Sequence, residues 1–169
     1  MISGEKNVKE TTQLITAMIN YFQKDPKRIN HFIKVHSYAK LICEMENIES
    51  QTSQIIELVA IVHDIGIKNC EEKYGSSSGK YQQIEGPPEA EKMLNEIGID
   101  HDIVNRICWL IAHHHTYDDI VEIDHQVLVE ADFLVNGYEE SMTASAINSI
   151  KNKIFKTESG KLLLKTILS

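Results

Sequence analysis

LVAIVHDIG, residues 58–66, places a histidine and an aspartate directly after a run of five apolar residues. Over residues 52–66 apolar side chains recur at three- and four-residue spacing, which is typical of a helix with one buried face. His63 continues that face, because it lies four residues after Val59. The pattern therefore predicts a helix that carries an ionisable residue, followed at once by Asp64, into the protein interior.

The same helical spacing continues along most of the chain, and strand-like alternation is nearly absent. Asp25-Pro26 ends one helix and begins the next, since proline suits the first helical turn. Gly98 ends another. We predict an all-α fold, a single compact domain over residues 1–169 with about seven or eight helices. The expected helices cover residues 8–23, 27–47, 52–66, 88–97 and 101–115, then 125–136 and a C-terminal segment of one or two helices within 139–168.

Residues 69–88 break this pattern. The stretch NCEEKYGSSSGKYQQIEGPP contains two of the three prolines and a high share of the eight glycines, residue types that interrupt regular structure. The sequence therefore predicts a long loop here. Because it directly follows His63-Asp64, we expect it to border any site that this pair forms and to act as a lid.

Composition narrows the class of protein. The chain has 169 residues, of which 42% are hydrophobic and 25% charged, as in an ordinary globular protein. A formal net charge of −8 argues against binding of extended nucleic acid. The polar N-terminus and the lack of an apolar run of about 20 residues predict a cytoplasmic protein without membrane contact. Reduced cysteines are expected, since no C-x-x-C pair links Cys43, Cys70 and Cys108.

Three further predicted helices carry an ionisable residue on an apolar face. His31 lies four residues before Val35, Asp132 lies four after Leu128, and His114 extends the apolar face of its own helix. Each alone is more often a hydrogen-bonded core histidine or an ion-paired aspartate. Together they are best explained by a shared divalent cation, because burying an unpaired carboxylate costs several kcal/mol. Imidazole and carboxylate ligands suit Mn, Fe, Zn, Co or Mg.

Helical spacing sets other histidines apart. His36 follows the first candidate ligand by five residues, which rotates it about 140° around the helix, so we expect it at the surface. His101 and His125 lie near helix starts and receive the same interpretation. For His113 and His115, contact with a ligand and contact with solvent both stay open.

These segments resemble the HD-domain superfamily of metal-dependent phosphohydrolases. Residues 58–66 are similar to its name-giving motif in the HDIG form. RINH at 28–31, with apolar residues four and eight positions later, resembles the first helix of the family. LVEAD at 128–132 is similar to the helix that carries a distal aspartate. The resemblance covers roughly residues 26–138.

The resemblance implies a ligand set and an activity. His31, His63, Asp64 and Asp132 would hold a divalent metal, and Asp64 would also orient or deprotonate the attacking water. Lys68, close to a position where relatives often carry lysine, would contact a phosphate or simply be solvated. The activity implied is hydrolysis of a small phosphate ester such as a nucleotide or another phosphorylated metabolite.

A second metal is implied in some relatives. If this chain binds a second metal, the resemblance implies that His114 is one of its ligands and that Glu85 takes the place of a histidine of those relatives. A glutamate in a loop is, however, commonly just solvated. One metal site is expected, and the second stays open.

Departures from the family pattern exclude two subclasses. The histidines are followed by TYDD at 116–119, not by the Gly-Tyr-Pro of cyclic-dinucleotide phosphodiesterases. IGIKN at 65–69 lacks the acidic pair of stringent-response hydrolases. Two alternatives to the phosphohydrolase remain: a non-catalytic metal-binding module with a sensor or interaction role, and a di-iron oxygenase.

Overall fold

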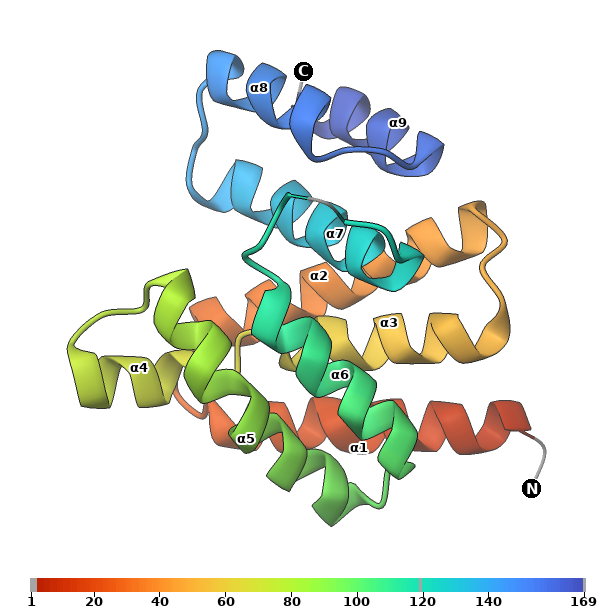
Figure 1. Ribbon diagram of the computed structural model, residues 1–169, viewed down its shortest axis with the longest axis vertical. Helices are drawn as coiled ribbons and strands as arrows, with labels where there is room; N and C mark the ends of the chain where they lie inside the picture. Colours follow the sequence, from red (N-terminus) through yellow and green to blue (C-terminus); the bar gives the residue numbers. More distant parts are fainter. Residues whose placement is uncertain (1–2, 119, 169) are drawn as a thin grey trace.

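The computed structural model describes residues 3–118 and 120–168, and this part of the chain consists of helices without a strand (Figure 1). The prediction of an all-α fold is confirmed. Asp119, part of the TYDD segment, lies outside the described residues. None of the helices in the described ranges has the length and apolar character that crossing a membrane requires. The described residues form nine helices: α1 (Ser3–Tyr21), α2 (Pro26–Met45), α3 (Ser50–Val62), α4 (Ile67–Tyr74), α5 (Gly79–Ile97), α6 (His101–His113), α7 (Ile123–Glu139), α8 (Ala144–Lys153) and α9 (Glu158–Leu168).

The centre of the fold is α3. The five residues from Leu58 to Val62 are all fully inaccessible to solvent. Such an all-round apolar helix is stable only where other helices surround it, and α1, α2, α6 and α7 pack against α3. Figure 1 shows α7 and α1 on opposite sides of α3, with α6 crossing in front. His63, which directly follows α3, therefore lies in the interior of the molecule.

Helix ends follow the predicted signals. The Asp25 side chain accepts a hydrogen bond from the Arg28 backbone N–H at 3.1 Å, and Pro26 begins α2. Gly98 adopts a left-handed conformation, with φ 87°, and ends α5. These two boundaries are confirmed.

The prediction of a long loop over residues 69–88 is wrong. Helix α4 and the first half of α5 cover nearly all of it, and the short helix expected at 88–97 is the second half of α5. Gly75 does end α4 in a left-handed conformation, but Gly86 serves packing and not a turn. A Cβ atom on Gly66 would lie 2.6 Å from the backbone nitrogen of Gly86, and one on Gly86 would lie 2.6 Å from a methyl group of Ile111. The additional helix, α4, raises the helix count above the expected seven or eight.

The two C-terminal helices are fixed to α7 by a buried carboxylate. Glu130, fully buried in α7, accepts hydrogen bonds from the backbone N–H groups of Lys156 at 2.6 Å and Thr157 at 2.9 Å. The Thr157 hydroxyl and the Gln126 amide also donate to it. Burial raises the pKa of Glu130 above its ordinary value, although these hydrogen bonds oppose the shift. The carboxylate thus holds the turn between α8 and α9.

Gly160→Ala is expected to disturb this anchor. A Cβ atom at residue 160 would lie 1.9 Å from Oε2 of Glu130. We expect the free energy of unfolding to fall by about 2 kcal/mol in urea denaturation, as for other overpacked sites. Lys161→Ala, one residue along α9, is the control. Because alanine normally favours a helix over glycine, an unchanged or raised midpoint for Gly160→Ala would contradict the anchor.

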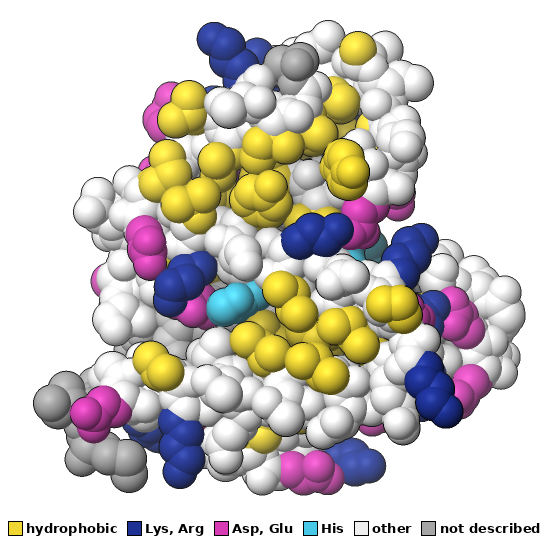
Figure 2. Space-filling view, turned by 180° about the vertical axis from the view of Figure 1, so that it is seen from behind, with side chains coloured by type: hydrophobic (Ala, Val, Ile, Leu, Met, Phe, Trp, Pro, Cys, Tyr) yellow, Lys and Arg dark blue, Asp and Glu magenta, His cyan; other side chains and the backbone are white. Residues whose placement is uncertain are grey.

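A shallow apolar groove lies on another part of the surface. Seen from behind in Figure 2, hydrophobic side chains gather in the upper part of the molecule, where α7 and α9 lie. The groove runs between α2, α7 and α9 and contains Tyr38, Leu134, Val135, Tyr138 and Ile167. Lys34 lines the groove as well.

Candidate metal centre

Four helices and one turn bring the predicted ligands together. His31 lies in α2, Asp132 in α7, and His63 directly after α3, with Asp64 next in the turn. His114 caps the end of α6. All four residues that spacing placed on apolar faces are buried, and His63 is only 1% exposed. The helix ends thus gather ionisable side chains from distant parts of the sequence.

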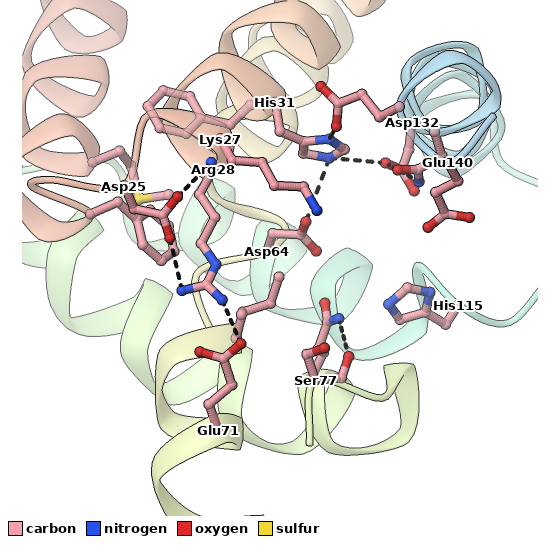
Figure 3. Close-up of a pocket in the computed structure, with 17 residues that line it drawn as sticks. Asp25, Lys27, Arg28, His31, Asp64, Glu71, Ser77, His115, Asp132 and Glu140 are labelled. Atoms are coloured by element: carbon pink, nitrogen blue, oxygen red, sulfur yellow. Dashed lines mark hydrogen bonds and ion pairs between the residues drawn. The ribbon is translucent and has the colours of Figure 1, made fainter. Parts of the chain in front are cut away.

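Imidazole nitrogens and carboxylate oxygens face one another at close range. Nε2 of His31 lies 3.3 Å from Oδ1 of Asp132 and 3.5 Å from Oδ2 of Asp64. Nε2 of His63 lies 3.6 Å from the same two oxygens. Figure 3 shows His31, Asp64 and Asp132 pointing toward one another across the pocket. The ligand atoms of His31, His63 and Asp64 therefore lie within 4.8 Å of one another, and the Asp132 oxygen adjoins the two imidazoles.

Backbone carbonyls fix which nitrogen of two rings carries the proton. Nδ1 of His63 lies 3.0 Å from the Ala60 carbonyl oxygen, and Nδ1 of His114 lies 2.7 Å from that of Ile111. A carbonyl only accepts, so Nδ1–H must donate, and in the neutral ring this leaves the lone pair on Nε2. Nε2 of both rings, and of His31, is buried without a hydrogen-bond partner among the described residues. These unpartnered lone pairs fit a bound cation.

The charges of the cluster also call for a cation. Burial alone would raise the pKa of Asp132, but the adjacent imidazoles of His31 and His63 hold it well below its usual range. Burial alone would lower the pKa of His31, but Asp132 and Asp64 raise it to about 9. The carboxylates therefore stay ionised and attract positive charge, which a divalent metal supplies without protonating the imidazoles.

Glu139, at the end of α7, was missed by sequence reasoning. Its Oε2 lies 2.9 Å from Nδ1 of His31, and Lys34 forms an ion pair with its other oxygen. A carboxylate on Nδ1 fixes the ring so that Nε2 faces the cluster, an arrangement common behind metal-binding histidines. One signal was available, because Glu139 follows Asp132 by seven residues and thus shares its helix face.

Glu139→Leu is expected to weaken metal binding ten- to hundredfold, a typical effect of losing such a supporting carboxylate. Glu140→Leu is the matched control, because Glu140 lines the same cavity, is exposed and belongs to none of the ion pairs around the cluster. Calorimetric titration of chelator-treated protein with Mn²⁺ measures both. Equal affinities for the two variants would show that Glu139 does not support His31.

Lys68 is not brought to the cluster. Its exposed side chain turns outward, with Nζ 5.2 Å from the centre of the Tyr21 ring, and it does not line the cavity. Two other basic residues, Lys27 and Arg28 in the first turn of α2, line the cavity instead. Lys68 lies in the first turn of α4, and that turn directs its side chain toward Tyr21.

Glu85 also lies outside the cluster. Its carboxylate accepts a hydrogen bond from the Tyr74 hydroxyl at 2.8 Å and pairs with Lys73, which lowers its pKa. A different residue, His115, lies beside His114 instead. Asp64, His114 and His115 offer ligand atoms within 4.8 Å of one another, and Nε2 of His115 is buried without a partner among the described residues.

The remaining histidines divide between surface and interior. His101 is exposed, as expected. The expectation that His36 and His125 lie at the surface is wrong. His36 is half-buried and lies 3.2 Å from a carboxylate oxygen of Glu57 on α3. His125 is buried, with Nε2 3.1 Å from the His113 carbonyl oxygen. Polar partners on neighbouring helices account for both, and such partners are invisible to helical spacing.

A cavity of about 360 Å³ opens beside the cluster. His31, Asp64 and Asp132 form part of its wall, and the basic residues of α2 form another part. Figure 3 shows that Ser77 and His115 lie on the side opposite α2. The candidate metal position is therefore accessible to a small molecule.

Comparison with known proteins agrees with this architecture. The profile of the HD domain family matches residues 28–137, a range that contains all four predicted ligands. The fold is similar to that of a predicted HD superfamily hydrolase from an uncultured Thermotogales bacterium. That similarity has a TM-score of 0.65 at 22% sequence identity and covers 92% of this chain and 83% of the other. No curated protein matches the chain.

Proposed function

The chain belongs to the HD domain family, and from that premise we propose that it is a metal-dependent phosphohydrolase with a metal held by His31, His63, Asp64 and Asp132. One observation carries the proposal. Buried Nε2 atoms of His31 and His63 face the carboxylates of Asp64 and Asp132 at 3.3–3.6 Å and have no hydrogen-bond partner among the described residues. Nitrogen and oxygen ligands of this kind suit Mn, Fe, Zn, Co or Mg.

A divalent metal at such a site acts as a Lewis acid, which lowers the pKa of water and withdraws electron density from a phosphoryl oxygen. The chain's own contribution centres on Asp64. Its Oδ2 faces His31 and His63, while its Oδ1 lies 3.7 Å from Nε2 of His114. We assign Oδ2 to metal binding and Oδ1 to orienting the attacking water and accepting its proton.

The substrate proposed is a small phosphate ester, such as a nucleotide or another phosphorylated metabolite. The cavity volume of about 360 Å³ lies at the lower end of the range for small-molecule sites. Its wall offers both a cationic α2 turn and polar side chains such as Gln82 and Asn136. A phosphoryl group and a polar organic group would each find partners there.

Phosphate release tests the proposal. Chelator-treated protein is reloaded with Mn²⁺ and assayed against nucleoside monophosphates, sugar phosphates and p-nitrophenyl phosphate. We expect release that depends on added metal and disappears with EDTA. Lack of release from every ester, with each of the five metals, would favour a non-catalytic metal-binding module and contradict the proposal.

A two-metal enzyme is the second candidate. It rests on two groups of potential ligands that share Asp64: one adds His31 and His63, the other His114 and His115. The second group contains His114 and His115, so a di-iron oxygenase is chemically conceivable for this chain. Elemental analysis, combined with assays of oxygen consumption and phosphate release, separates the two candidates. Two irons per chain together with oxygen consumption would favour the oxygenase, whereas metal-dependent phosphate release without oxygen consumption would exclude it.

A further inference from the structure

The cavity beside the cluster has little free positive charge. Arg28 lies between two carboxylates that also line the cavity, Asp25 at 3.1 Å and Glu71, with which its guanidinium forms a second ion pair. This triad therefore has no positive charge to offer a ligand. Lys27, the other basic residue of the wall, is exposed and forms no ion pair with the described residues. Figure 3 shows it beside Arg28, extending from α2 over the cavity.

One free ammonium limits how much negative charge the cavity can compensate. Further acidic residues, Glu139 and Glu140, line the opposite wall, and Glu139 is already paired with Lys34 and His31. Because Asp64 and Asp132 already offset the two charges of a divalent metal, Lys27 is the cation of the described cavity wall that remains for one phosphoryl group. A diphosphate or triphosphate chain would place additional negative charge among carboxylates, where nothing compensates it.

Gln82 supplies the second observation. It is buried and lines the cavity, and its Nε2 donates to the Ser77 carbonyl oxygen at 2.8 Å. Because a carbonyl only accepts, this contact fixes the amide with its NH₂ group toward Ser77 and Oε1 facing away. Oε1 is buried and has no donor among the described residues. A buried acceptor of this kind calls for a donor, and a ligand in the cavity can supply one.

We propose that the cavity takes a phosphate ester with a single phosphoryl group, whose organic part donates a hydrogen bond. Lys27 contacts the phosphoryl oxygens, and Oε1 of Gln82 accepts from a hydroxyl or N–H group of the organic part. This inference rests on the proposed phosphohydrolase function and adds to it the class of substrate and two specificity residues.

Four probes separate charge from hydrogen bonding. AMP, ADP and ATP share one organic group and differ in charge, whereas the organic group of p-nitrophenyl phosphate has no donor. We expect kcat/KM for AMP to exceed that for ATP by about tenfold or more. Lys27→Ala is expected to raise KM about tenfold for AMP and for p-nitrophenyl phosphate, with kcat less affected, because a charge-assisted hydrogen bond is lost. Lys92→Ala, which removes an exposed lysine of α5 outside the cavity, is the control.

Gln82→Leu tests the acceptor. We expect kcat/KM for AMP to fall about tenfold more than that for p-nitrophenyl phosphate, since only AMP has a donor that hydrogen-bonds to Oε1 of Gln82. Gln83→Leu is the matched control, because Gln83 does not line the cavity and its amide donates to Thr116. Thermal unfolding of each variant verifies that it folds, and the ratio between the two substrates is insensitive to a uniform loss of active protein.

The outcomes distinguish this inference from the proposed function. Hydrolysis of p-nitrophenyl phosphate together with equal or better use of ATP would overturn the inference alone. The inference would also be overturned if Gln82→Leu lowered kcat/KM for AMP and for p-nitrophenyl phosphate by the same factor. A KM for Lys27→Ala equal to that of Lys92→Ala would overturn it as well. Failure of the metal-loaded wild type on all four probes would overturn the proposed function, and the inference would fall with it.

Discussion

Asp64→Asn is expected to lower kcat/KM for phosphate release by about a thousandfold or more. The carboxylate of Asp64 is shared by both ligand groups, and its two oxygens face His31, His63 and His114. Asparagine keeps the shape of the side chain but removes its charge. The amide of asparagine has only one oxygen, so it can face only one of the two ligand groups, and its NH₂ group then faces the other as a donor. Metal binding and orientation of water would therefore be lost together.

The matched control for this prediction is Glu71→Gln. Glu71 lines the same cavity and loses the same charge, but it pairs with Arg28 and lies outside the cluster. Steady-state kinetics with p-nitrophenyl phosphate at saturating Mn²⁺ compare the two variants. Comparable activity in Asp64→Asn and Glu71→Gln would contradict the role assigned to Asp64.

Loss of activity in Asp64→Asn should not reflect unfolding. Burial raises the pKa of Asp64, but His63 and His114 lower it to about 2, so the ionised carboxylate is on balance stabilised by its surroundings. Asparagine loses that stabilisation, and we expect metal-free Asp64→Asn to unfold at a moderately lower temperature than metal-free wild type while staying folded under the conditions of the assay. Thermal unfolding of both metal-free proteins checks this.

Gly66→Ala is expected to produce the largest loss of stability, about 3 kcal/mol or more in the free energy of unfolding. The backbone of Gly66 has an ordinary helical φ of −68°, so alanine is not strained there by conformation. The cost is steric. A Cβ atom would lie 2.6 Å from the nitrogen and 2.8 Å from Cα of Gly86, and backbone of a packed helix cannot move away cheaply.

Gly4→Ala is the control for Gly66→Ala. A Cβ atom at Gly4 would meet nothing within 4 Å, and the residue lies in the first part of α1. Urea denaturation should give Gly4→Ala an unchanged or slightly higher stability. If Gly66→Ala matched this control, the close approach of α5 to the turn after His63 would be wrong.

Periodicity predicted most of the fold because each helix buries one face. The residues that interrupted apolar faces, His31, His63, His114 and Asp132, are also those that the structure gathers. A polar residue on an apolar face is a strong signal, since the core tolerates it only where something satisfies it. That part of the candidate site was therefore visible in the sequence.

The errors share one cause, which is that local composition does not report tertiary contacts. Gly86 with the two prolines after it predicted a loop, yet this segment lies within α5, where the small residue admits a neighbouring backbone. The same packing places Glu85 beside Lys73 and Tyr74, away from the cluster. Gln82 and Lys27 have no local signal at all, because only the tertiary fold brings the first turns of α2 and α5 to one cavity.

The metal content of the protein tests the central claim most directly. Wild type and Asp132→Ala are treated with chelator, dialysed against Mn²⁺ and then against metal-free buffer, and analysed for bound metal. The cluster geometry predicts about one Mn²⁺ per wild-type chain and nearly none in the variant, because Asp132 faces both His31 and His63. Wild type that retains no metal, or a variant that retains as much as wild type, would contradict the account.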